Sequence, residues 1–523
     1  MINQHNSHIH KMRLESFDIP IIYSTFPGNF DMHINGWSFR NDKDNSMIEV
    51  ELTKEEIEEL SQKGLISKIQ QIGDQRYLIK RLRTLDIEIA SDYAIDTMNS
   101  LKSRYDEGHY TKKDGSYDID ALKMDFASIY RTTCTQRCPH CFNQEDDFYI
   151  QKIIKGQKLM KWSETLALLK QAKRFGLESV KFLGIGEIFS NAQLFNILDD
   201  IRNEGLIIAI FTKGTALGDD ETAKNCNYKG IETAEDLVER ISQYHNVSIL
   251  LGANSFVPDF QDTMVGCGKD GGVKDYTYKR NRALKLLIKH KFNDPQYGKR
   301  LALIAAPVTP KVSDETVEMY EWAIKRNMPV VTIPTMVSGK GSGELEWLLG
   351  QFEYDETLIK RYDPQKVLTR EQRYTQWLID FYSDIYVKAL QLGIYDMDTL
   401  NNEGLSGYAG AAKCQQSHNG MYIRLPGSVQ ECPGRCIGAE IIEDLREQSL
   451  LATWIGSINH DRTVNCRALC SVKMKDLTNS NVHVCDCCRV YDNVGSMPLE
   501  LEQKVLENLN TMLYCNFKTV GGY

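Results

Sequence analysis

The sequence predicts an α/β protein whose core is a parallel sheet with helical crossovers. Between residues 116 and 340, short apolar stretches alternate with amphipathic ones, and a strand that is followed by a helix favours a parallel neighbour. A second observation is the distribution of the 14 cysteines: none lies in the first 133 residues and nine lie after residue 410. With 523 residues, the chain is also too long for a single core. We therefore expect several domains and two separate groups of metal ligands.

We expect four parts along the chain. They are an α+β module over residues 1–115, the α/β core over 116–340, a helical linker over 341–410 and a cysteine-rich, cluster-binding domain over 411–523. In the first part, Thr53 and Glu56 predict a capping box at the start of a helix, and Gly64 suits its C-terminal cap. A strand at 47–52 precedes this helix and a hairpin at 65–82 follows it. Such a module resembles a winged helix, so it either covers the next domain or binds a partner such as a peptide.

The core should contain six short apolar strands in chain order, at residues 126–130, 179–187, 207–214, 246–254, 300–309 and 329–337. Amphipathic segments predict helices at 164–176, 278–292 and 314–327. The linker contains a longer helix at 370–393, whose apolar face predicts core packing. Because functional loops lie at the carboxyl ends of parallel strands, candidate site residues should follow these strands.

Three cysteines, Cys134, Cys138 and Cys141, follow the first of these predicted strands. Three thiolates cannot complete a tetrahedral zinc site, but they can bind three irons of a [4Fe–4S] cluster and leave the fourth iron open. A zinc site completed by a distant residue is the alternative. The sequence contains no secretory signal and no apolar run of the ~20 residues that a membrane helix needs. We therefore expect a cytoplasmic protein, in which thiols are kept reduced.

The spacing Cys-x3-Cys-x2-Cys, together with the glycine-rich turns after later strands, resembles the radical S-adenosylmethionine (radical SAM) enzymes. The resemblance implies a partial (β/α)6 barrel, a [4Fe–4S] cluster on the three cysteines, and SAM chelated to the fourth iron. One-electron reduction then cleaves SAM, and the 5′-deoxyadenosyl radical removes a hydrogen atom from the substrate. The resemblance also implies an electron donor of the flavodoxin or ferredoxin type.

Several loops resemble the SAM-binding motifs of this family, in the same order along the chain. The stretch "GIGE" resembles a Gly-Gly-Glu motif, with Ile185 between the glycines. The stretch "FTKG" resembles a Thr-Asn-Gly motif, with Lys213 in place of the asparagine. Either Arg280 or Arg282 is expected to contact the SAM carboxylate. The resemblance implies further SAM contacts from His140, Gly184, Gly186, Glu187, Thr212 and Ser248.

The cysteine-rich tail begins like a SPASM domain, a module that binds auxiliary [4Fe–4S] clusters in radical SAM enzymes. Cys414, Gly427 and Cys432 have its opening spacing, whereas the later cysteines depart from its pattern. Nine thiols suit one or two clusters, one cluster with one zinc site, or zinc alone. The candidate ligands are Cys414, Cys432, Cys436, Cys466, Cys470, Cys485, Cys487, Cys488 and Cys515.

These features predict a radical SAM enzyme that modifies a peptide or protein. One alternative is oxidation or epimerisation of a small molecule, such as a sugar or antibiotic precursor, and another is a non-enzymatic iron–sulfur or zinc protein. The net charge of −9 argues against a nucleic-acid or membrane-surface partner. Cys267 lies in a glycine-rich loop, where it either returns a hydrogen atom to a substrate radical or is an ordinary loop cysteine.

Overall fold

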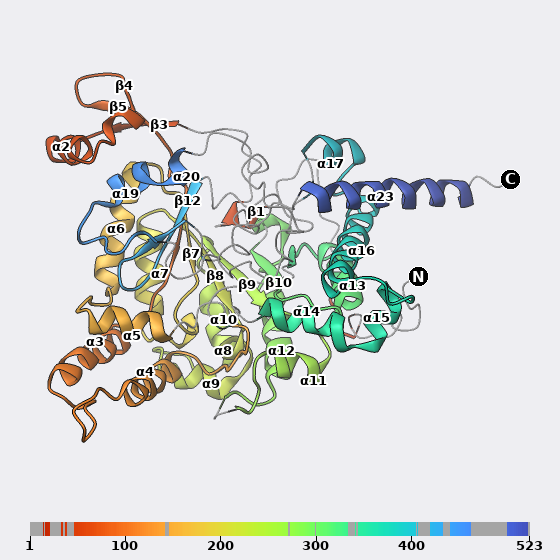
Figure 1. Ribbon diagram of the computed structural model, residues 1–523, viewed down its shortest axis with the longest axis horizontal. Coiled ribbons are helices and arrows are strands. Elements are labelled where there is room, and N and C mark those ends of the chain that lie inside the picture. Colours follow the sequence, from red (N-terminus) through yellow and green to blue (C-terminus); the bar gives the residue numbers. More distant parts are fainter. Residues whose placement is uncertain are drawn as a thin grey trace.

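The computed structural model shows a central sheet with helices around it (Figure 1). It describes residues 14, 16–20, 33–34, 37–38, 47–141, 146–269, 272–298, 300–332, 340, 344–403, 405, 419–431, 433, 440–461 and 499–520. Two short strands near the start, β1 (His33–Ile34) and β2 (Trp37–Ser38), pair only with each other. No helix in the described ranges is both long enough and apolar enough to cross a membrane.

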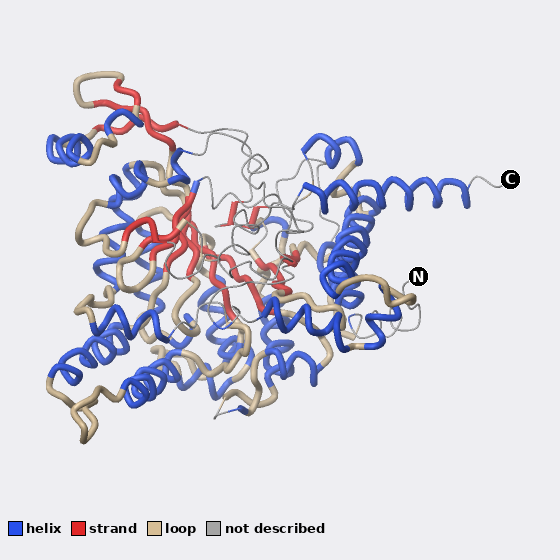
Figure 2. Tube along the Cα trace, viewed as in Figure 1, coloured by secondary structure: helices blue, strands red, loops and turns tan. Residues whose placement is uncertain are grey.

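The central sheet has nine strands in the order β11-β10-β9-β8-β7-β6-β12-β13-β14. Six neighbouring strands run parallel: β6 (Thr84–Ile87), β7 (Ser179–Phe182), β8 (Ile207–Thr212), β9 (Val247–Gly252), β10 (Leu301–Ala305) and β11 (Val330–Thr332). Figure 2 shows these strands in the middle of the molecule, with helices beside and below them. The α/β class and the six parallel strands of a partial barrel are confirmed.

The prediction of the first strand at residues 126–130 is wrong. That stretch belongs to helix α4 (Ile119–Thr133), and the first parallel strand is β6, which starts 42 residues earlier in the part predicted as the N-terminal module. Leu122, Phe126 and Tyr130 are all buried at i, i+4 spacing, so the apolar residues follow the helical period. A five-residue apolar stretch does not distinguish the two periods, because the decisive Leu122 lies outside it. The boundary at residue 116 stays a prediction.

Helices cover the outer face of the sheet. They are α6 (Trp162–Arg174), α7 (Leu194–Asn203), α8 (Thr215–Gly218), α9 (Asp220–Asn225), α10 (Ala234–Ser242), α11 (Pro258–Met264), α12 (Tyr276–Lys289) and α13 (Ser313–Ile324). Alternate strand residues, such as Ile208 and Ile210 of β8, pack against them in the main hydrophobic core. The predicted helices at 164–176, 278–292 and 314–327 are thus confirmed.

Two helices are inserted between the first parallel strand and the cysteines. These are α3 (Asp92–Asp106) and α4, and together with α5 (Asp146–Ile154) they form a second hydrophobic core. Ile185, from the loop after β7, is 2% exposed and belongs to this second core. The cysteine triplet therefore lies between two helices, α4 and α5, that pack on one another.

The N-terminal module has the elements that its sequence predicts. Strand β3 (Met47–Glu51), helix α2 (Lys54–Gln62), β4 (Gln70–Gln71) and β5 (Arg76–Lys80) form a three-stranded sheet in the order β3-β5-β4 with one helix. The Thr53 and Glu56 capping box is present, and Gly64 has a left-handed φ of +69°. Glu56 also pairs with Arg174 of α6 at 2.7 Å, so the module is held against the barrel.

The start of the C-terminal part extends the barrel sheet. Strand β12 (Gly420–Ile423) pairs in parallel with β6, and β13 (Val429–Gln430) and β14 (Glu440–Ile442) continue the sheet. Beyond β12, Arg424 pairs with Glu88 at 3.2 Å, and both side chains are at most 2% exposed. The boundary at residue 411 also stays a prediction, although the sheet continues across it.

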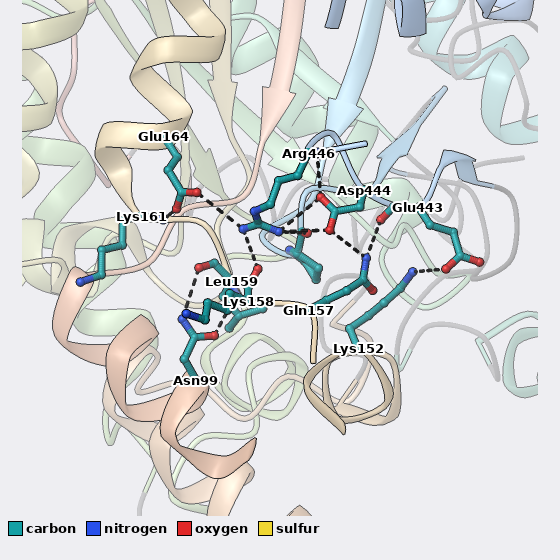
Figure 3. A network of polar contacts seen from close by, with 11 residues as sticks. Asn99, Lys152, Gln157, Lys158, Leu159, Lys161, Glu164, Glu443, Asp444 and Arg446 are labelled. Carbon is teal, nitrogen blue, oxygen red and sulfur yellow. Dashed lines mark hydrogen bonds and ion pairs between the residues drawn. The ribbon is translucent and has the colours of Figure 1, made fainter. Parts of the chain in front are cut away.

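A second set of polar contacts holds the segment after β14 (Figure 3). The Arg446 guanidinium donates to the Lys158 carbonyl at 2.8 Å, and Gln157 donates to the Glu443 carbonyl at 3.1 Å. Lys152, on α5, pairs with Glu443 at 3.3 Å. Since α5 follows the cysteine triplet, the C-terminal segment is fastened directly to the helix behind that loop.

The remaining helices lie beyond the sheet. They are α14 (Glu344–Tyr354), α15 (Glu356–Tyr362), α16 (Arg370–Gln391), α17 (Met397–Glu403), α19 (Leu450–Gly456), α20 (Ile458–Asp461) and α23 (Leu499–Val520). Helix α16 confirms the long helix that was predicted at 370–393, and Trp377, Phe381, Ile385 and Ala389 are buried as expected. Among the predicted tail ligands, all but Cys515 lie outside the described residues, and Cys515 falls within α23.

Candidate functional site

The cysteine loop leaves the end of α4 and is stabilised from within. Cys134 is the C-terminal cap of α4. The Arg137 guanidinium donates to the carbonyls of Cys134 and Gln136, each at 2.7 Å, and therefore fixes the turn between the first two cysteines. The Gln136 amide donates to the hydroxyl of Thr215, which follows β8. The loop is thus tied to the carboxyl end of the third parallel strand.

A second loop, after α11, packs against the cysteine loop from the other side. The amide of Arg137 donates to the Val265 carbonyl at 3.0 Å, and the amide of Val273 donates to the Thr135 carbonyl at 3.0 Å. A Cβ at Gly266 would lie 2.2 Å from the Arg137 carbonyl oxygen, so only glycine permits this approach. Cys267 lies next to this contact, which places the candidate hydrogen donor in a loop that touches the cysteine loop.

The turn after β7 contacts the last residue of α4. The amide of Glu187 donates to the Thr133 carbonyl at 2.7 Å. Gly186 has φ of +101°, and a Cβ there would lie 2.4 Å from the same carbonyl oxygen. Ile185, which interrupts the Gly-Gly-Glu resemblance, packs into the second core formed by α3, α4 and α5. The departure from the motif thus anchors the turn to the inserted helices.

Glu187 is buried and holds the loop after β8. Its carboxylate accepts hydrogen bonds from the Thr212 hydroxyl at 2.8 Å and from the Lys213 amide at 3.0 Å. Burial raises the pKa of Glu187, although these hydrogen bonds oppose the shift. A cationic ligand beside the carboxyl group would favour its charged form. The carboxyl group is therefore suited to contact a positively charged ligand.

The three cysteines influence one another electrostatically. Burial raises the pKa of Cys134, and the charges of Cys138, Cys141 and Glu187 raise it further. Burial also raises the pKa of Cys138 to about 11, with Lys213 acting in the opposite direction. Because Cys138 and Cys141 oppose the ionisation of Cys134, a cationic metal group bound at this loop would favour the thiolate form of Cys134.

Three cysteines on one loop match the number of protein ligands of a [4Fe–4S] cluster with one open iron. No group of three His, Cys, Asp or Glu side chains in the described ranges converges on one metal ion. A [4Fe–4S] cluster binds each cysteine at a different iron, so its ligands need not converge on one point. Nearby, the Nε2 atom of His140 is buried without a hydrogen-bond partner, and burial lowers the His140 pKa to about 3. A neutral imidazole with a free nitrogen is therefore available beside the third cysteine.

The structure brings together some predicted SAM contacts and not others. Gly184, Gly186, Glu187 and Thr212 gather at the carboxyl ends of β7 and β8. Ser248 does not join them, because it is fully buried near the amino end of β9 and pairs with Ala209. From Ser248 to the end of β9 at Gly252 is about 13 Å along the strand.

The two arginine candidates also differ in position. Arg280 is fully buried, donates to the Ser255 carbonyl at 2.8 Å and lies over the Phe256 ring. Arg282 pairs with Asp220 at 2.8 Å on the outside of the barrel. Both arginines therefore have protein partners already. A further residue, Cys226, has no predicted role; it is buried, and its thiol donates to the Thr222 carbonyl.

Two residues near the site were missed at the level of sequence. The Tyr276 hydroxyl donates to the Lys213 carbonyl at 2.9 Å and to the Gly252 carbonyl at 3.4 Å, and no local pattern marks this residue. The amide of Lys340 donates to the Cys141 carbonyl at 2.9 Å. In the sequence, the only feature that could have marked Lys340 is its position in the glycine-rich stretch after the sixth predicted strand.

A parallel α/β barrel with three cysteines at its carboxyl edge defines the class of this protein. Residues 129–346 match the family model of the Radical SAM superfamily, a match that spans the cysteine triplet, β7 to β11 and the start of α14. The chain thus contains a radical SAM domain and is an enzyme that uses SAM. This domain implies a [4Fe–4S] cluster and SAM as cofactors, and it decides against the non-enzymatic alternative.

Similarity to solved structures is looser. The crystal structure of Streptococcus suis SuiB bound to precursor peptide SuiA has a TM-score of 0.35 and 13% identity, over 72% of this chain and 84% of that chain. A further crystal structure of Streptococcus suis SuiB has a TM-score of 0.35 and 14% identity, over 71% of this chain and 83% of that chain. No curated protein sequence matches the chain. The family assignment comes from the family model.

Proposed function

We propose that Cys134, Cys138 and Cys141 bind a [4Fe–4S] cluster and that SAM completes the coordination of its fourth iron. The observation that carries this proposal is the position of three cysteines on one loop whose first residue follows the contact between Thr133 and the buried Glu187, at the carboxyl edge of the sheet. When bound, the cluster and SAM together supply the radical that removes a hydrogen atom from the substrate.

The surrounding residues hold and orient these groups. Glu187, held by Thr212, accepts a hydrogen bond from the cationic amino group of SAM, and this contact favours the ionised carboxylate. Gly186 lets the turn approach α4, so that the glutamate and Cys134 keep a fixed separation. The backbone at His140 is assigned to adenine. Together these residues position SAM over the cysteine loop.

The proposal is tested with anaerobically purified, cluster-reconstituted protein. After addition of dithionite and SAM, 5′-deoxyadenosine is quantified together with iron and zinc per chain. Cys138→Ala should abolish deoxyadenosine formation and remove about four irons. Cys226→Ala, which removes a buried thiol of the same domain, serves as the matched control and should keep both. Deoxyadenosine from the Cys138→Ala protein at the unmodified rate would refute the assignment.

Auxiliary clusters in the tail are a second element of the proposal. The SPASM-like spacing has its glycine at Gly427, which takes φ of +89° in the turn between β12 and β13. This hairpin pairs the last two residues of β12 with β13, with Tyr422 opposite Gln430. A total of about eight or more irons per chain supports at least one auxiliary cluster, whereas about four irons with zinc makes the tail a zinc module.

We further propose a peptide or protein as the substrate. The support comes from the N-terminal module, where β3 pairs with β5 on one side and meets no other strand among the described residues. Such an edge can accept an extended peptide through backbone hydrogen bonds. Glu49 and Glu51 are exposed on this strand, whereas Val50 is 3% exposed and packs inward.

Synthetic peptides encoded by short reading frames beside the gene provide the test. Binding is measured by fluorescence anisotropy, and modification is followed by mass spectrometry with SAM and reductant. A peptide that binds and changes mass supports the proposal. Binding to none of these peptides, together with turnover of a sugar or antibiotic precursor, would instead establish the small-molecule alternative. The proposal for Cys267 is tested in the same assay, since Cys267→Ala should block only a reaction that returns hydrogen to substrate carbon.

A further inference from the structure

Lys213 replaces the asparagine of the family motif, and its backbone is fixed on both sides. Its amide donates to the Glu187 carboxylate at 3.0 Å, and its carbonyl accepts from the Tyr276 hydroxyl at 2.9 Å. The next amide, of Gly214, donates to the Thr212 hydroxyl at 2.8 Å. The side chain therefore starts from a defined point at the carboxyl end of β8.

From this point the side chain crosses to the neighbouring strand. A Cβ at Gly252, the last residue of β9, would lie 2.9 Å from Lys213 Cδ and 3.1 Å from Nζ. Gly252 is in a strand and does not have a left-handed φ, so its backbone does not require glycine. The space that glycine leaves is occupied by the lysine, and this space keeps the ammonium group over the end of β9.

The lysine lies at the same edge of the sheet as the cysteine loop. Its amide is bonded to the Glu187 carboxylate, and the amide of Glu187 is bonded to the carbonyl of Thr133, the residue before Cys134. Among the described residues, the ammonium forms no ion pair and no hydrogen bond. The oxygens of Glu187 already accept bonds from Thr212 and from backbone amides. A partly buried cation without a partner is suited to an anionic ligand.

Other cations near the site are less suitable for such a ligand. Arg280 is fully buried and donates to the carbonyls of Ser255 and Gly252, and Arg282 pairs with Asp220. Lys340 is exposed, and it meets the cysteine loop through its backbone amide, which donates to the Cys141 carbonyl. Lys213 alone among these four residues combines partial burial, a fixed backbone and an ammonium group without a partner in the described part of the chain.

We propose that Lys213 binds the carboxylate of the methionyl part of SAM, in place of either arginine. This inference rests on the proposed cluster and SAM site. Lys213 reaches this position from β8 because Gly252 leaves room for it, which assigns a joint role to two residues on neighbouring strands. A charge-assisted hydrogen bond contributes about 1.5–3 kcal/mol, which corresponds to roughly a 10- to 150-fold difference in Kd.

The test measures SAM binding by calorimetry on reconstituted protein whose iron content and visible spectrum match those of the unmodified enzyme. Lys213→Met should raise the Kd for SAM about 10- to 100-fold, and Lys213→Arg should restore most of the affinity. Decarboxylated SAM, which keeps the adenosine and sulfonium groups, should lose at most about twofold with Lys213→Met. Lys224→Met, at an exposed lysine of the same domain, is the matched control and should bind SAM normally.

Unchanged SAM affinity in Lys213→Met would overturn the inference, and so would an equal loss for both ligands. If the Lys213→Met protein does not assemble its cluster, Gly252→Ala tests the inference instead. The methyl group of the new alanine displaces the lysine side chain but leaves its charge in place. That variant should weaken SAM binding severalfold, and normal binding would equally overturn the inference. An unmodified enzyme that holds its cluster but binds no SAM would refute the proposed function itself.

Discussion

Replacing Gly186 with alanine tests whether the turn after β7 sets the position of the cysteine loop. The new Cβ would lie 2.4 Å from the Thr133 carbonyl oxygen, whereas ordinary contact begins at 3.4 Å. The turn and the end of α4 must therefore separate by about 1 Å. Because Cys134 follows Thr133 directly, this separation moves the first cysteine away from Glu187.

Gly205→Ala is the matched control for this substitution. Gly205 also has a left-handed φ, of +67°, but its Cβ would meet nothing within 4 Å. Both variants pay the left-handed backbone cost of about 1–2 kcal/mol, and only Gly186→Ala adds the displacement. Since a site must be held within about 0.5 Å of its working geometry, we expect Gly186→Ala to weaken SAM binding more than tenfold and Gly205→Ala to leave it unchanged.

The assay combines calorimetry with the electron paramagnetic resonance spectrum of the reduced protein before and after SAM addition. A SAM-dependent change in this spectrum reports on the cluster with an open iron and not on fully ligated clusters. Thermal unfolding of both variants measures the shared backbone cost. If Gly186→Ala and Gly205→Ala bind SAM equally well and show the same spectral change, the turn does not position the loop and the reasoning is refuted.

Three further predictions concern stability. Ile185→Ala should lower the free energy of unfolding by about 2–4 kcal/mol in urea titrations, because Ile185 is 2% exposed in the second core, and an unchanged midpoint would contradict this packing. Burial, reinforced by nearby acidic groups, raises the pKa of Asp384 to about 6 from 3.8. The folded state therefore binds this proton more tightly than the unfolded state does, so Asp384 makes the free energy of unfolding fall as pH rises from about 4 to 6. Asp384→Asn should remove this pH dependence, and melting curves recorded across that range will measure it. Arg424→Met should cost about 3–5 kcal/mol by leaving the buried Glu88 carboxylate without its cation, whereas the double variant with Glu88→Gln should recover part of this loss, and full additivity would contradict the pairing.

Much of the barrel could be predicted from local patterns. Strands β7 to β11 and helices α6, α12 and α13 lie where apolar periodicity predicts them. Each helix buries one face against the sheet, and the parallel strands are buried on both faces. The capping box at Thr53 and Glu56 could also be predicted, since its hydrogen bonds join residues that are three positions apart in the sequence. The Gly-rich turns after β7 and β8 followed from the same strand assignments.

The first strand was misplaced for a physical reason. Residues 126–130 are short and apolar, and only the burial of Leu122, one turn earlier, shows that their period is helical. The strand β6 gave a weaker signal, because the buried Asp86 within it and the buried Glu88 directly after it interrupt the apolar pattern. Their charges are tolerated because Lys181 of the neighbouring strand β7 pairs with Asp86, and Arg424, directly after β12, pairs with Glu88.

The cysteine triplet, the glycine-rich turns and the order in which they follow the strands are evident from the sequence, since spacing and residue type are local properties. The roles of the residues that depart from the motifs emerge from the folded structure. Ile185 fills a core made by α3, α4 and α5, and Lys213 occupies the space above Gly252 on the next strand. Both depend on contacts between residues distant in the chain, and such contacts exist only once the sheet has brought its strands together.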